Sequence, residues 1–114
     1  MAFTTATVVS VTQSKQQLQG LFNEMWTVNL TVDPSSVAAG AEDTATFTIP
    51  GVALGDMVMG VAPGVTLTAT GEIDYRAWVS SANTLTLRLT NLHASSAADL
   101  ASSTWKVMIG RPNW

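Results

Sequence analysis

Two carboxylates are the first candidates for chemistry in this sequence. Glu72 and Asp74 are separated by one residue, so on a β-strand their side chains would share one face, about 6.5–7 Å apart. A pair at that separation could supply the acid and the base of glycoside hydrolysis. Arg76 continues the same face, however, and an acid-acid-base row is more typical of a solvated strand with local ion pairing. We therefore predict no catalytic residue, and a glycosidase is the most remote of the functions considered.

Neither the histidine nor the glycines of the chain form a recognisable site. His93 is the only histidine and follows a predicted strand in a loop, and one histidine without spaced partners makes neither a triad nor a metal site. No cysteine is present to supply a thiolate. Gly51, Gly55, Gly60 and Gly64 match neither dinucleotide nor phosphate-loop spacing. The sequence thus predicts no cofactor, no metal ion and no enzyme activity.

Charge is scarce and dispersed along the chain. Only 11% of the 114 residues are charged, the net charge is -3, and the five cations do not cluster, so direct nucleic-acid binding is not expected. The most apolar stretch, residues 51–65, is interrupted by Asp56 and Pro63 and is too short to span a bilayer. No signal peptide is recognised. Low charge with 46% hydrophobic residues indicates either a surface covered by neighbouring molecules or one solvated by Thr, Ser and Asn.

Four tryptophans are better candidates for binding, because each offers a large contact area. Trp26 and Trp105 begin alternating apolar stripes and are predicted to lie in the core. Trp78 falls on an outward face, where it is either an interface anchor or packed within its own domain. Trp114 follows Arg111 and a proline. It belongs either to an arm that docks on a neighbour or to a tail that folds back on its own subunit.

The elements that must position these side chains are mostly strands, because apolar and polar residues alternate along much of the chain. The alternating stretches are residues 26–32, 44–49, 65–70, 73–79, 84–90 and 105–109, with weaker ones at 7–12 and 56–61. Turn-forming pairs such as Pro50-Gly51 and Pro63-Gly64 separate them, and Ser80–Asn83 is typical of a hairpin loop. About eight short strands at this spacing predict an all-β, antiparallel β-sandwich or jelly-roll-like fold, as a single domain over residues 1–114.

One short helix is expected before Trp26. Ser14-Lys15-Gln16-Gln17 matches a capping box, and Leu18, Leu21, Phe22 and Met25 follow at helical spacing. This predicts an amphipathic helix over Ser14–Met25, lying across one open end of the sandwich, and a further helical turn is considered at 96–101. The residues predicted to form interfaces are Leu18, Phe22, Trp78, Arg111 and Trp114.

From Val28 onward the chain resembles a family of short structural proteins of bacteriophage virions. The resemblance rests on four stretches spread over residues 28–110, namely Val37–Gly40, Ile49–Asp56, Val79–Asn91 and Ser103–Val107. It implies a virion component with a sandwich or jelly-roll fold, often oligomeric. The region 1–26 departs from the family pattern, which makes it a candidate attachment element.

Resemblance and composition together lead to a functional expectation. The preferred hypothesis is a protein that decorates or cements the exterior of the capsid, contacting the major capsid protein as a homo-oligomer, with a trimer favoured. Neither a nucleic acid nor a membrane is expected as a partner. The alternative is a carbohydrate- or receptor-binding module of a tail fibre or spike, which would use exposed tryptophan with nearby acidic or amide groups.

Overall fold

The computed structural model describes residues 3, 5–14, 21–67 and 72–113 of the chain. All regular secondary structure in these residues is β-strand. The strands are β1 (Thr5–Ser14), β2 (Phe22–Asp33), β3 (Glu42–Thr48), β4 (Met57–Ala62), β5 (Ile73–Ser81), β6 (Thr84–Asn91) and β7 (Ser103–Pro112).

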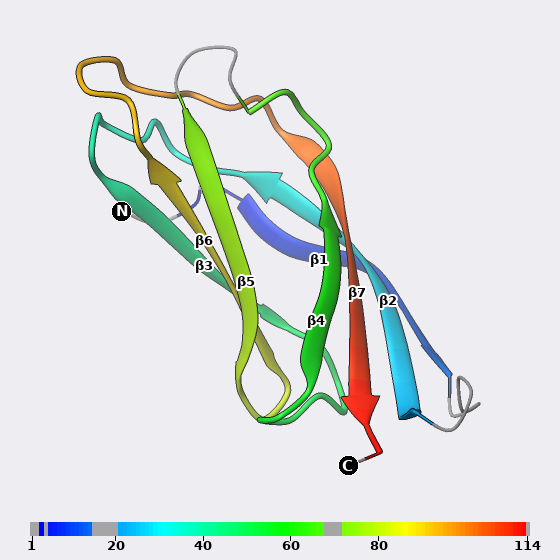
Figure 1. Cartoon of the computed structure of the whole chain (residues 1–114). Helices are drawn as coiled ribbons and strands as arrows, with labels where there is room; N and C mark the ends of the chain where they lie inside the picture. The colour runs from blue at the N-terminus through cyan, green and yellow to red at the C-terminus, as the bar shows by residue number, and fades with distance from the viewer. Residues whose placement is uncertain (1–2, 4, 15–20, 68–71, 114) are drawn as a thin grey trace.

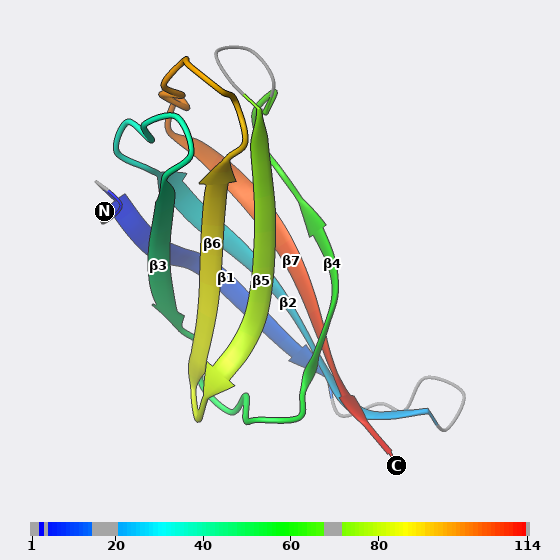
Figure 2. The same cartoon turned by 60° about the vertical axis from the view of Figure 1, so that its left-hand side comes forward.

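The strands form two antiparallel sheets that face each other (Figures 1 and 2). One sheet has four strands in the order β1-β2-β7-β4, and the other has three in the order β3-β6-β5. β1 and β4 are therefore the edges of the larger sheet, and β3 and β5 are the edges of the smaller one. The predicted all-β, antiparallel sandwich architecture is confirmed.

The core between the sheets follows from the alternation in the sequence. β2 and β7 are in register, with Trp26 opposite Ile109 and Leu30 opposite Trp105, and all four side chains are fully buried. The three leucines of β6 and Phe47 of β3 cover them from the smaller sheet. Threonines occupy many alternate positions that face outward, where a β-branched side chain suits the pleated surface. The predicted core positions of Trp26 and Trp105 are thus confirmed.

The predicted helix over Ser14–Met25 is wrong, because the residues described at its two ends lie in strands. Ser14 is the last residue of β1, and β2 begins at Phe22. Ser14 pairs with Met25, and Met25 also pairs with Gly110 of β7. A helix of this length is marginal alone, whereas the strand gains hydrogen-bonded neighbours on both sides. Residues 15–20, including Leu18, lie outside the described residues.

Two smaller expectations also change. The predicted strand at 65–70 is absent at 65–67, and residues 68–70 lie outside the described residues, so the structure has seven described strands. Gly64, just after β4, approaches the carbonyl oxygen of Thr104 so closely that a Cβ would not fit there. Residues 96–101 contain only an isolated bridge from Ala98 to Val37, with no helical turn.

The hairpin loop predicted around Ser80–Asn83 is confirmed. β5 ends at Ser81 and β6 begins at Thr84, and Asn83 has a φ of 60°, in the left-handed region that asparagine tolerates. Its side-chain Oδ1 accepts a hydrogen bond of 2.8 Å from the backbone N–H of Gly51. The β5–β6 turn is thereby joined to the Pro50-Gly51 turn that follows β3.

Candidate functional site

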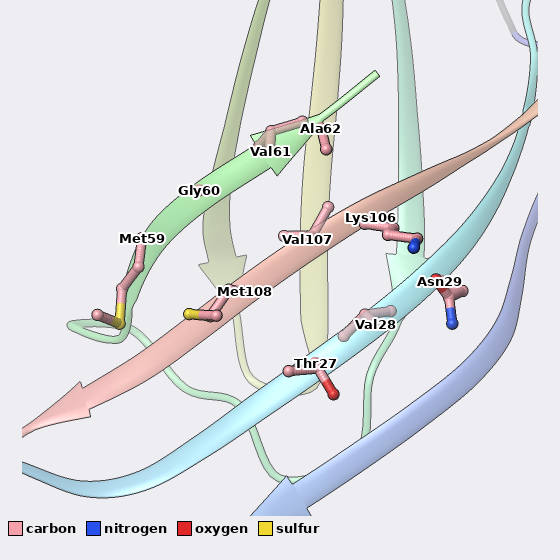
Figure 3. Close-up of a pocket in the computed structure, with 10 residues that line it drawn as sticks. All are labelled: Thr27, Val28, Asn29, Met59, Gly60, Val61, Ala62, Lys106, Val107 and Met108. Carbon is pink, nitrogen blue, oxygen red and sulfur yellow. The ribbon is translucent and has the colours of Figure 1, made fainter. Parts of the chain in front are cut away.

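An open groove of about 590 Å³ lies on the outward face of the larger sheet (Figure 3). It crosses the three strands β2, β7 and β4. The residues that line it are Thr27, Val28, Asn29, Met59, Gly60, Val61, Ala62, Lys106, Val107 and Met108. Its volume lies within the range of small-molecule sites, which is roughly 300–1,000 Å³, but it is a groove on an open sheet face.

Side-chain size explains why this part of the sheet is hollow. Gly60 pairs with Met108, and Ala62 pairs with Lys106, so β4 contributes little side-chain bulk next to two long side chains of β7. A bulge between Val58 and Gly60 interrupts the register there, and Met59 lies at that point. Figure 3 shows Met59 and Met108 near one end of the groove, with Lys106 and Asn29 farther along.

Methionines gather on and beside this groove. Met57, Met59 and Met108 are 45%, 40% and 41% exposed, and Met25 pairs with Gly110 in the adjacent row. A methionine side chain is unbranched and polarizable, so it adapts to the shape of a partner and is common at binding surfaces. Among the described lining residues Lys106 is the only charged one. The groove can therefore bury an apolar surface, with one cation available to an acidic group.

Phe22, a predicted interface residue, lies at the end of this methionine group. It is only 8% exposed. A Cβ on Gly110 would lie 2.9 Å from Cδ1 of Phe22 and 2.6 Å from Sδ of Met59. The absent side chain at Gly110 thus lets Phe22 and Met59 pack over the backbone of β7. Phe22 is therefore buried beside the groove.

Arg111, another predicted interface residue, is occupied by contacts within the chain. Its Nε and Nη2 donate to Oδ1 and Oδ2 of Asp56, both at 2.9 Å, and Nη2 also donates to the carbonyl of Gly51 at 2.8 Å. Nη1 lies 3.4 Å from Oε2 of Glu24, and the guanidinium is 5.2 Å from the Trp26 ring centroid. The hydrogen bond with Asp56 is the main cause that raises the pKa of Arg111, against a lowering by burial. Arg111 therefore joins β7 to β2 and to the loop before β4.

Trp78 lies on the outward face of the smaller sheet, half-buried in β5 and opposite Thr86. The guanidinium of Arg88 lies 5.1 Å from its ring centroid, a cation–π contact. Nε of Arg88 is also 3.5 Å from Oε2 of Glu42. Trp78 is therefore not a core residue, and part of its ring surface is covered by Arg88. Trp114, the remaining interface candidate, lies outside the described residues.

The two carboxylates considered for catalysis do not form an isolated pair. Glu72 precedes β5, and its carbonyl accepts the N–H of Leu92. Asp74 pairs with Thr90 on the exposed face, beside a shallow hollow of about 190 Å³ that Glu42, Arg76 and Arg88 also line. Glu42 and Asp74 flank Thr90, and Arg76 and Arg88 form the neighbouring row, as expected for a solvated face with ion pairing.

His93 has a local role in its loop. Its Nδ1 accepts hydrogen bonds from the backbone N–H groups of Ser95 and Ser96, at 3.1 and 3.0 Å. Within the described residues no cluster of three or more His, Cys, Asp and Glu side chains could hold a metal ion. The same part of the chain contains no helix long and apolar enough to cross a membrane.

Comparison with protein-family models, with curated proteins and with solved structures finds no match to this chain.

Proposed function

We propose that this chain is a structural component of a bacteriophage virion that decorates or cements the capsid, and that it acts through protein–protein contacts and not through catalysis. The methionine-lined groove on the larger sheet is the observation that carries the proposal. It presents exposed, adaptable apolar side chains on an antiparallel sheet, and Lys106 adds one cation to its lining. The resemblance of residues 28–110 to short virion proteins supports the same assignment.

The partner in this proposal is a surface of the major capsid protein. The groove would bury an apolar segment of that protein against Met59 and Met108, and Lys106 would pair with a nearby carboxylate. The apolar floor at Gly60 and Ala62 lets a partner backbone approach the sheet closely. Loss of water from these side chains would supply most of the binding energy.

Met108→Glu tests this proposal by placing a charge in the groove. Because Met108 is 41% exposed, the substitution should leave the fold intact. We expect the affinity for capsids lacking this protein to fall at least about tenfold, since an unpaired charge would be buried on binding. Co-sedimentation of the purified chain with such capsids measures the change.

Leu54→Glu is the matched control, because Leu54 is 72% exposed and lies outside the groove. Capsid binding of this variant should equal that of the unchanged chain. Equal binding by all three proteins would remove the groove from the proposal. Failure of the unchanged chain to bind any capsid would reject the decoration role.

A further inference from the structure

The two sheets differ in how their edges are protected. The edges of the smaller sheet carry charges, Glu42 and Asp43 in β3 and Asp74 and Arg76 in β5. The edges of the larger sheet, β1 and β4, contain no charged residue at all. Charged side chains on an edge strand are a common means of preventing unwanted strand pairing. The larger sheet lacks this means on both sides.

Of these two edges, β1 is the better template for another strand. It has 10 residues, from Thr5 to Ser14, with no proline, glycine or charge, and it is rich in Thr and Val, residues that favour strands. β4 has only six residues, and Gly60 lies among them. In the described residues β1 pairs only with β2, and no other backbone hydrogen bond reaches it. Its second edge therefore offers N–H and C=O groups to a partner.

Val9 marks the centre of this edge. The register with β2 shifts between Val8 and Ser10, and the Val9 side chain at this bulge is 59% exposed. An exposed valine in the middle of an uncharged edge strand is a surface that gains from being covered. The bulge adds local twist to the strand but places no charge on it.

We propose that β1 is a self-association edge, on which β1 of a second copy of this chain pairs antiparallel about a twofold axis near Val9. A second copy fits because β1 has no charged residue, so two copies of it can pair without placing any like charges opposite each other, although the chain carries a net charge of -3. The two larger sheets would join into one continuous sheet, and each Val9 would be covered near the axis. Twofold contacts of this kind are the commonest in homo-oligomers.

This inference goes beyond the proposed function and does not depend on where the protein sits in a virion. A twofold β1 contact gives a dimer in solution, whereas the capsid-decoration hypothesis favours a trimer. The groove on the outward face of β2, β7 and β4 would remain open in such a dimer. Self-association and capsid binding can therefore be measured separately.

Val9→Lys is the substitution that tests the edge. Two lysines near the twofold axis should raise the dimer dissociation constant at least about tenfold, because like charges opposite each other disfavour pairing. Leu92→Lys is the control, since Leu92 is 62% exposed and follows β6, away from β1. Sedimentation velocity over a concentration series should show a dimer for the unchanged chain and for Leu92→Lys, and a monomer for Val9→Lys.

Amide hydrogen exchange of the unchanged chain gives a second reading that needs no variant. Protection of the β1 amides directed away from β2 should increase with protein concentration. A monomer at all soluble concentrations, a trimer in solution, or a Val9→Lys dimer of unchanged affinity would overturn the β1 pairing. None of these results would reject the decoration role, which depends on capsid binding and on Met108.

Discussion

At the scale of single residues, Arg111 shows how a terminal strand is held in place. Asp56 accepts two hydrogen bonds from it and a third from the backbone N–H of Ala53, at 2.9 Å. The Asp56 side chain is only 3% exposed, and that of Arg111 is 32% exposed. A forked pair of this kind is stronger than an exposed ion pair, because both partners are oriented and partly desolvated.

Asp56→Ala should therefore lower the free energy of unfolding by about 2 kcal/mol, since it leaves the Ala53 N–H and the Arg111 guanidinium without their main acceptor. Chemical denaturation followed by tryptophan fluorescence measures the change. Glu42→Gln is the comparison, because the side chains of Glu42 and Arg88 are 56% and 39% exposed. It should cost less than about 0.5 kcal/mol. Equal effects of the two substitutions would contradict the role given to Arg111.

The sequence could not distinguish this role of Arg111 from an interface role. Its partners Asp56 and Gly51 are 55 and 60 residues away along the chain, and the pairing of β4 with β7 places Asp56 beside Arg111. The surroundings of Phe22 could not be predicted from the sequence either, because its contact with Gly110 arises from the β2–β7 register. By contrast, the core positions of Trp26 and Trp105 could be predicted, because each begins a local alternating pattern.

At the scale of elements, the β5–β6 turn is fixed by one residue. The backbone N–H of Asn83 donates to the carbonyl of Val52, its carbonyl accepts from Ile49, and its side chain accepts from Gly51. The turn thus links the hairpin to the segment after β3.

Asn83→Ala should lower the free energy of unfolding by about 2 kcal/mol, because alanine is strained at a φ of 60° and cannot accept the Gly51 hydrogen bond. Asn83→Gly should cost less, since glycine adopts positive φ freely and loses only the side-chain bond. Thermal unfolding of both variants measures the two effects. A glycine variant less stable than the alanine variant would contradict the importance given to the left-handed backbone conformation at this position.

Local patterns identified all seven described strands, but they failed where long-range pairing decides the structure. Leu21, Phe22 and Met25 fit a helical stripe, yet Met25 lies between Ser14 and Gly110 in the sheet. The groove was also missed, because its methionines come from strands far apart in the sequence. Met57-Val58-Met59 suggested only a weak strand. Nothing local indicated that β4 would lie beside β7.

At the scale of the whole molecule, the two outward faces have different chemistry. The smaller sheet presents Asp74, Arg76, Arg88 and Glu42, which suit contact with water. The larger sheet presents the methionine group, the groove and two uncharged edges. This asymmetry supports an orientation in which the larger sheet faces protein partners and the smaller sheet faces solvent.

The most direct test of the proposed role is cryo-electron microscopy of the virion in which the proposal places this protein. The proposal predicts ordered density for the sandwich on the capsid exterior, with Met59, Met108 and Lys106 against the major capsid protein and the Trp78 face toward solvent. Density for the chain on a tail fibre alone, with the Trp78 face on a receptor or glycan, would contradict the decoration role and favour the alternative of a binding module.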